Sequence, residues 1–223
     1  MKQITFYFDV ISPYAYLAFE RLPNALEGLS YSVRYQPVLF AAMLEHHGQL
    51  GPAEIAPKRD WTYRQVLWQA HTLGIDMVMP SAHPFNPLPL LRLALACSLG
   101  DDAGSLANAP NRYVCETIFR HVWRPVGNKP QDAVDPARLA ALAAQLAPLR
   151  DAQSESVKDA LKINTQEAIA GGVFGVPALV VDGKVFWGLD SLPMLRAYLA
   201  GDAWFDGDAW DAAARVGAGV QRK

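Results

Sequence analysis

A hydroxyl group stands near the N-terminus where a short apolar run meets a predicted helix. Residues Ile4–Asp9 are apolar and β-prone, and Ser12-Pro13 follows at once. Serine is a favoured N-cap and proline suits the first helical turn, so we expect a strand and then a helix to about Ala25. The N–H groups at a helix start favour negative charge. Ser12 could therefore hold an anion, or it could act only as an N-cap.

The same site contains no reactive sulfur of its own. The tetrapeptide Ser12-Pro13-Tyr14-Ala15 has no cysteine at either end, so it cannot form a disulfide. A free thiol has a pKa of about 8.5 and is only a few per cent ionised at pH 7. A helix start and a hydroxyl hydrogen bond together could lower that pKa by about two units, or about 2.7 kcal/mol. Ser12 suits the activation of a thiol that arrives from outside; a nucleophilic Ser12 would need a nearby base, and no histidine is close in sequence.

A proline stands directly before a second β-prone segment late in the chain. The residues Phe174-Gly175-Val176-Pro177 lead into Ala178–Val181, and proline is acceptable at the first position of a strand. Asp182-Gly183 is a favoured two-residue hairpin turn, so Lys184–Trp187 is expected to pair with that strand. Pro177 could be an ordinary trans proline that opens an edge strand, or a cis proline that faces the Ser12 turn.

An acid and a hydroxyl occur together where the chain leaves this hairpin. Asp190-Ser191 follows Gly188-Leu189 and precedes a predicted amphipathic helix over Leu192–Leu199. Asp190 could pair with an ammonium group while Ser191 and the helix N–H groups take a carboxylate. That combination matches the amino-acid end of a γ-glutamyl group. Either residue could instead supply only the N-cap.

The elements that must position these motifs predict an α/β fold. The chain opens β-α-β, with its second strand over Tyr31–Pro37, and closes α-β-β-α, with a helix from about Val157 to Ala170. Between them little strand character is found, and helices are expected over residues 88–99, 112–122 and 137–149. This order is that of a thioredoxin-like βαβ…ββα domain with a large inserted helical domain. In such folds a cis proline before the late strand leaves the N–H and C=O of the preceding residue free for a peptide-like ligand.

The domain boundaries follow from these elements. We expect a discontinuous thioredoxin-like domain over residues 1–38 and 153–201, an inserted helical domain over 39–152, and a C-terminal tail over 202–223. The tail carries Trp204, Phe205 and Trp210, which favour a short helix packed on the body.

Composition excludes several classes of function. Of the 223 residues 51% are hydrophobic and 19% charged, and the net charge of −2 gives no attraction to nucleic acid. No apolar run is long enough for a membrane span and the N-terminus does not resemble a signal peptide, so a cytoplasmic protein is expected. Cys97 and Cys115 lie in apolar helical stretches and are interpreted as buried, reduced side chains. The histidines are scattered without ligand spacing, so no metal site is predicted.

Two stretches carry a specific resemblance. Phe6–Ala18 (FYFDVISPYAYLA) and Gly171–Leu192 (GGVFGVPALVVDGKVFWGLDSL) resemble 2-hydroxychromene-2-carboxylate isomerases, which are related to kappa-class glutathione transferases within the DsbA-like group. The order of elements and the helical insertion agree, so the resemblance covers about residues 1–200. Residues 61–73 and 122–134, which should shape the acceptor pocket, depart from the family pattern.

The resemblance implies a role for individual residues. Ser12 matches the serine that assists the thiolate of reduced glutathione, Val176 and Pro177 match the pair that binds its cysteinyl portion, and Asp190 and Ser191 match the residues at its γ-glutamyl end. The family often has arginine after the acid, so Ser191 weakens that contact by one charge. Lys58 matches a basic residue that meets a carboxylate of glutathione or substrate, although a solvated surface lysine is the alternative.

The substrate side is implied in the same way. Asn86, in Phe85-Asn86-Pro87, matches an asparagine in a turn beside the substrate, and it also fits a simple turn. Phe85 and Trp187 are expected to supply apolar walls for a small aromatic substrate.

The resulting hypothesis is a homodimeric glutathione-dependent isomerase. It would interconvert 2-hydroxychromene-2-carboxylate-like hemiketals and trans-o-hydroxybenzylidenepyruvate-like open-chain acids through a transient adduct of the glutathione thiolate. A kappa-type glutathione transferase and a non-catalytic binding protein of the glutathione fold are the alternatives. Dithiol oxidoreductase chemistry is opposed by Ser12 and Ala15.

Overall fold

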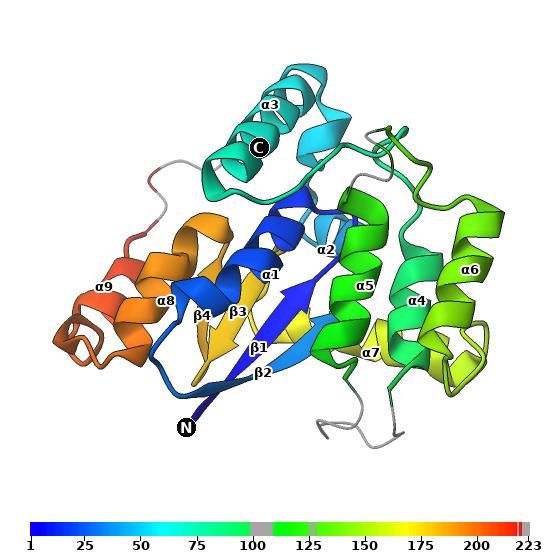
Figure 1. The fold of residues 1–223 in the computed structure, drawn as a ribbon. Helices are drawn as coiled ribbons and strands as arrows, with labels where there is room; N and C mark the ends of the chain where they lie inside the picture. The colour runs from blue at the N-terminus through cyan, green and yellow to red at the C-terminus, as the bar shows by residue number, and fades with distance from the viewer. Residues whose placement is uncertain (99–108, 125–126, 128, 218, 220–223) are drawn as a thin grey trace.

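Four strands form one mixed sheet in the order β2-β1-β3-β4. In the computed structural model, which describes residues 1–98, 109–124, 127, 129–217 and 219, these are β1 (Lys2–Phe8), β2 (Tyr31–Pro37), β3 (Ala178–Val181) and β4 (Lys184–Trp187). β1 pairs with β2 in parallel and with β3 antiparallel, and β3 pairs antiparallel with β4. Asp182 and Gly183 both have positive φ angles, as the predicted two-residue turn requires. The sheet confirms the predicted thioredoxin-like βαβ…ββα order (Figure 1).

The alternating side chains of β1 explain why helices cover both faces of the sheet. Ile4, Phe6 and Phe8 are fully buried and belong to the main hydrophobic cluster with α1 (Pro13–Ala25), α5 (Arg112–Trp123) and α8 (Leu192–Leu199). Tyr7 points to the opposite face, where a smaller cluster joins the sheet to α2 (Phe40–His46) and α7 (Glu155–Ala170). Figure 1 shows α1 in front of the sheet and α7 behind it.

All four strands lie outside residues 39–152. The α-helices described within this range are α2, α3 (Ala56–Leu73), α4 (Leu88–Ala96), α5 and α6 (Pro136–Leu146). Helices α2 and α3 were not predicted. Helix α6 ends three residues before its predicted end, because Ala147 precedes Pro148 and leaves the helical region. The end predicted for the helix of α4, Leu99, lies outside the described residues. The main hydrophobic cluster contains residues from both predicted domains, and the division into domains stays a prediction.

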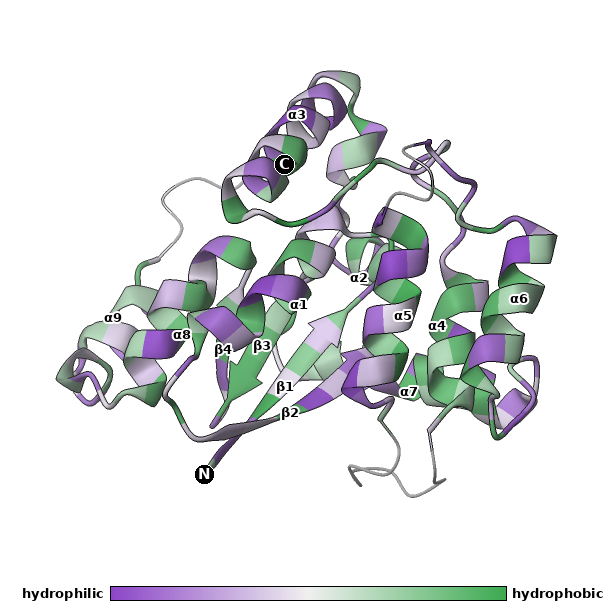
Figure 2. Ribbon diagram, in the orientation of Figure 1, coloured by the Kyte–Doolittle hydropathy of each residue, from purple (hydrophilic) through white to green (hydrophobic). Residues whose placement is uncertain are grey.

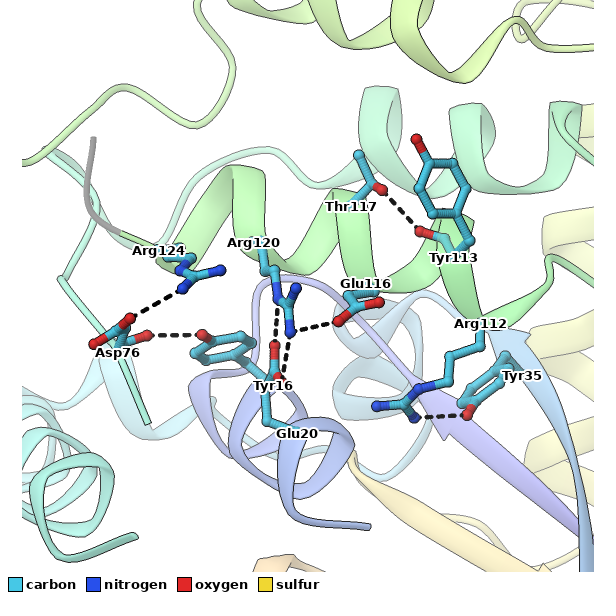
Figure 3. Close-up of polar contacts among 10 residues, drawn as sticks. All are labelled: Tyr16, Glu20, Tyr35, Asp76, Arg112, Tyr113, Glu116, Thr117, Arg120 and Arg124. Carbon is cyan, nitrogen blue, oxygen red and sulfur yellow. Dashed lines mark hydrogen bonds and ion pairs between the residues drawn. The ribbon is translucent and has the colours of Figure 1, made fainter. Parts of the chain in front are cut away.

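Helix α1 is tied to α5 by an ion pair between Glu20 and Arg120 (Figure 3). Arg120 donates from Nε and Nη2 to the two carboxylate oxygens of Glu20, at 2.8 and 3.1 Å, and also contacts Glu116. A two-pronged guanidinium–carboxylate pair fixes orientation as well as distance. The Tyr16 hydroxyl donates to the Asp76 carbonyl at 2.7 Å. Helix α1 is therefore held against both α5 and the segment that follows α3.

The C-terminal segment packs on the body of the protein, as predicted. Phe205 is buried, and its ring lies 6.2 Å from that of Phe186 on β4. Trp210, in the short helix α9 (Ala209–Ala214), lies 5.7 Å from the same Phe186 ring. We refer to Phe186, Phe205, Trp210 and Tyr198 as the tail cluster.

The two cysteines are free thiols that lie in or at the end of helices. Cys115 is buried in α5 and Cys97 is half-buried at the end of α4, and both thiols are free. Burial raises the pKa of each thiol, so both favour the protonated form. Within the described residues, no helix is long and apolar enough to cross a membrane, and no three His, Cys, Asp or Glu side chains gather as a metal site would require.

Candidate active site

Ser12 caps the helix that follows the central strand. Its Oγ accepts a hydrogen bond from the Ala15 N–H at 3.3 Å, and its own N–H donates to the Asp9 carbonyl at 3.1 Å. Pro13 occupies the first turn of α1, where a backbone N–H would have no partner within the helix, so its missing N–H costs no hydrogen bond. The predicted N-cap is confirmed. Ser12 is nearly buried, at 8% exposure, so its hydroxyl lies in a largely desolvated environment.

The Ser12 turn meets the late proline across a sequence separation of 164 residues. The Ser12 Oγ–H donates to the Val176 carbonyl at 3.3 Å, and the Val176–Pro177 bond is cis. We expected both polar groups of Val176 to be free, but its carbonyl is engaged by Ser12. In the described part of the chain its N–H has no partner. Val176 therefore presents its N–H as a hydrogen-bond donor, while its carbonyl contacts the Ser12 hydroxyl.

Asp190 and Ser191 are brought to the same region by a short 3-10 helix, η3 (Leu189–Ser191), which contacts α1. The Gly188 N–H donates to the Pro177 carbonyl at 2.9 Å and so joins this turn to the cis-proline loop. Asp190 is exposed. The pKa of the Tyr14 hydroxyl is raised, first by the burial of Tyr14 and second by the negative charge of Asp190. The carboxylate thus lies near the first turn of α1.

Ser191 does not cap α8 with its side chain. Its hydroxyl donates to the Gly188 carbonyl at 2.8 Å, and helix α8 begins without a side-chain cap. Ser191 therefore stands at the predicted N-cap position, but its side chain bonds within the local turn and does not accept from a helix N–H.

Helix α3 lies beside the Ser12 turn but presents few apolar side chains to it. Only Val66 and Ala70 of α3 are buried, and Figure 2 shows a largely hydrophilic helix. Tyr14 donates from its hydroxyl to Gln65 Oε1 at 2.6 Å and so ties α1 to α3. Lys58 is exposed in the first turn of α3, and among the described residues no contact joins it to Ser12.

The segment that precedes α4 carries two further predicted residues. Asn86 is exposed, and its Oδ1 accepts from the Leu88 N–H at 3.1 Å, which is the simple turn that was the alternative. Phe85 is half-buried, and its ring lies 6.0 Å from that of His83. His83 Nε2 in turn contacts the Ile11 carbonyl at 2.8 Å. This segment therefore borders the Ser12 turn through His83.

Trp187 flanks the cis-proline loop. Its ring lies 5.0 Å from that of Phe174 and covers Gly175, where a Cβ would come within 2.8 Å of the indole Nε1. Trp187 is 53% exposed. Glycine at position 175 thus allows an indole to lie against the backbone next to Val176.

Asp9 is a site residue that the sequence reasoning missed. Its buried carboxylate accepts from the Ile11 N–H at 3.0 Å and from the Phe40 N–H at 2.9 Å. Burial raises the pKa of Asp9 to about 7, although both hydrogen bonds oppose that shift. The available signal was a charged residue that ends an apolar strand three positions before Ser12.

The sheet order, the capped helix after β1 and the cis proline before β3 together define a thioredoxin-like domain. The family model of the DSBA-like thioredoxin domain matches residues 3–200, so the chain belongs to this family. The resemblance drawn from the two sequence motifs is confirmed.

Individual proteins that are similar to this chain carry names from the two groups that the sequence motifs resemble. Glutathione S-transferase kappa 2 of Caenorhabditis elegans is 28% identical, over 89% of this chain and 92% of the relative. A 2-hydroxychromene-2-carboxylate isomerase of Sphingobium xenophagum is also 28% identical, over 89% and 98%. A solved structure of a 2-hydroxychromene-2-carboxylate isomerase superimposes with a TM-score of 0.73 at 23% identity, covering 92% of this chain and 98% of that one, which shows a shared fold.

Proposed function

We propose that this protein is a glutathione-dependent isomerase that interconverts 2-hydroxychromene-2-carboxylate-like hemiketals and trans-o-hydroxybenzylidenepyruvate-like open-chain acids. One observation carries the proposal: the Ser12 hydroxyl, at the start of α1, contacts the carbonyl before a cis proline, in a turn that contains no cysteine. Relatives named isomerases and kappa transferases support it. A cytoplasmic location and a homodimer remain part of the proposal.

The donor set of the site fits glutathione. The Val176 N–H offers a peptide donor for the cysteinyl portion beside Pro177, and Asp190 with Ser191 would hold the γ-glutamyl end. Lys58 would meet a carboxylate. Asn86, Phe85 and Trp187 would border the aromatic substrate, with the exposed Trp187 and Phe174 rings as an apolar surface.

Ser12 would act by changing hydrogen-bond partner. Its hydroxyl has a single proton, which in this structure goes to the Val176 carbonyl at 3.3 Å. Neutral O–H···O bonds are commonly about 2.7–2.8 Å, so this bond is long and easily exchanged for one to a charged sulfur. When bound, glutathione supplies a nucleophilic sulfur that is returned at the end of each turnover. The start of α1 and the Ser12 hydroxyl would keep that sulfur deprotonated.

The product of the reaction tests the proposal. The protein is incubated with a chromene carboxylate and less than one equivalent of glutathione per substrate. An isomerase brings the two isomers to equilibrium through many turnovers per glutathione and leaves glutathione unchanged. Conversion that stops when glutathione is consumed, with a sulfur-containing product, would assign the kappa-transferase alternative, which the Caenorhabditis elegans relative favours. Binding of glutathione without turnover would indicate a non-catalytic binding protein and contradict the proposal.

Gly188→Ala should weaken glutathione binding through Asp190. Gly188 has a φ of +92°, and a Cβ at this position would contact Asp190 Oδ1. The substitution should therefore displace the carboxylate, and affinity measured by calorimetry should fall about tenfold, as for a lost charged contact. Gly183→Ala is the matched control: its φ is +75°, but no atom lies within 4 Å of the added Cβ. Both variants should lose about 1–2 kcal/mol of stability, and equal affinities would contradict the role of Asp190.

A further inference from the structure

The backbone of the Ser12 turn is held by side chains that lie far away in the sequence. The Val10 carbonyl accepts from Trp123 Nε1–H at 3.0 Å, and the Ile11 carbonyl is 2.8 Å from His83 Nε2. The rings of His83 and Trp123 lie 5.6 Å apart. Both hydrogen bonds of Ser12 Oγ, in contrast, are 3.3 Å long. The orientation of Ser12 therefore depends mainly on the backbone that carries it.

His83 can bind the Ile11 carbonyl only in one neutral tautomer. A carbonyl oxygen has no proton to donate, so Nε2 must carry the hydrogen and Nδ1 must be the acceptor. Tyr63, on α3, has its hydroxyl 2.7 Å from Nδ1 and 2.9 Å from the His83 carbonyl. The one proton of this hydroxyl is shared between two acceptors, the His83 carbonyl and the nearer Nδ1, which carries no hydrogen in this tautomer. The contact with Nδ1 favours the tautomer that has its proton on Nε2. Burial lowers the pKa of His83 and so favours the neutral ring.

We propose that Tyr63 and His83 form a positioning relay in which Tyr63 fixes the tautomer of His83 and His83 holds the Ile11–Ser12 peptide. Neither residue touches the reacting sulfur; both act through the backbone of Ser12. This inference rests on the proposed glutathione function and adds two residues that the family resemblance did not supply.

The surroundings of the relay are apolar. Phe85 and Trp123 pack against the imidazole, and the hydrogen bond to Ile11 opposes the lowering of its pKa by burial. Arg59 and Asp60, on the first turns of α3, are the charged groups that act on the Tyr63 hydroxyl, and they act in opposite directions. The tautomer is therefore decided locally by the Tyr63 hydroxyl and the Ile11 carbonyl.

Three variants separate the donor from the ring. His83→Leu removes the donor, His83→Gln keeps an N–H at about the place of Nε2, and Tyr63→Phe removes only the hydroxyl that selects the tautomer. The readout is the pKa of the bound glutathione thiol, followed by ultraviolet absorbance of the thiolate. His83→Leu should raise this pKa by about one unit, and turnover should fall about tenfold, because small displacements of catalytic groups are costly. His83→Gln should restore most of both.

Tyr63→Phe gives the sharper test because its effect should depend on residue 83. In the wild-type background it frees His83 to exchange tautomers and should raise the thiol pKa. In the His83→Gln background no tautomer exists, so the same substitution should have a much smaller effect, limited to the loss of the hydrogen bond to the carbonyl of residue 83. Tyr16→Phe is the matched control: it also removes a tyrosine hydroxyl that donates to a carbonyl, that of Asp76, away from the turn. It should leave the thiol pKa unchanged.

A second measurement is independent of glutathione. Nitrogen NMR of imidazole-labelled protein without ligand should show the Nε2–H tautomer of His83 in the wild type and a mixture in Tyr63→Phe. If His83→Leu leaves the thiol pKa unchanged, or Tyr63→Phe acts equally in both backgrounds, the relay is overturned. If the wild type does not bind glutathione, the proposed function fails, while the tautomer measurement still supports or refutes the relay.

Discussion

Replacing Ser12 with alanine should leave most of the glutathione affinity intact and remove most of the turnover. The variant loses the hydroxyl that would donate to the sulfur, and hydrogen bonds to charged groups contribute about 1.5–3 kcal/mol. That range corresponds to a rise of about one to two units in the pKa of the bound thiol and to about a 10- to 100-fold loss of turnover at neutral pH. Thiolate absorbance and steady-state kinetics measure the two effects.

Stability has to be separated from chemistry, because Ser12 is also an N-cap. Its loss should destabilise the protein by about 1 kcal/mol. Asn111→Ala is a matched control, since Asn111 caps α5 in the same way by accepting from the Val114 N–H at 3.0 Å. Ser12→Thr should retain the hydroxyl and much of the activity. If Asn111→Ala lost turnover to the same extent as Ser12→Ala, or if Ser12→Ala kept full turnover, Ser12 would have no part in the chemistry.

Asp9 should make the protein less stable as the pH rises toward neutrality. Its ordinary pKa is about 3.9, and in the folded protein burial raises its pKa to about 7. Between these values the unfolded chain has released the proton while the folded protein keeps it. The stabilisation is complete below the lower value and is lost as the pH rises through the higher one, by about 4 kcal/mol in total.

Urea unfolding of the wild type and Asp9→Asn across this pH range measures the effect. Asparagine does not titrate, so the variant should lose this component of the pH dependence, whatever its stability at one pH. Asp182→Asn is the control, because Lys2 holds the pKa of the exposed Asp182 below its ordinary value and its titration falls outside the range. Parallel curves for wild type and Asp9→Asn would show that Asp9 is charged in the folded protein throughout.

The parts of the fold that were predicted depend on short-range signals. The apolar, β-prone run of β1, Ser12-Pro13 at the start of α1 and Asp182-Gly183 in the hairpin each determine structure within a few residues. The meeting of Ser12 with Val176 required the order of elements and the family resemblance as well. The local signal at Ser191 located the N-cap of α8 but not the bond of its hydroxyl, which donates back to the Gly188 carbonyl.

The contacts that were missed join residues whose distance in space no local pattern encodes. His83 and Ile11 are 72 residues apart, and Tyr14 and Gln65 are 51 residues apart. The second contact depends on where α3 lies, and α3 reaches the first through the contact between Tyr63 and His83. That helix buries only Val66 and Ala70 and leaves Trp61 and Trp68 exposed, so no continuous apolar stripe marks its inner face. Polar hydrogen bonds attach it to the Ser12 turn.

The tail cluster extends the folded unit beyond the region that the family model matches. The family match ends at residue 200, yet Phe205 and Trp210 cover the Phe186 ring of the edge strand β4. A polypeptide cut at that boundary would present Phe186 to solvent beside the unpaired edge of β4, and such edges promote aggregation. Expression of this protein for crystallisation should therefore retain at least residues 1–214, since the minimal family segment would be prone to precipitate.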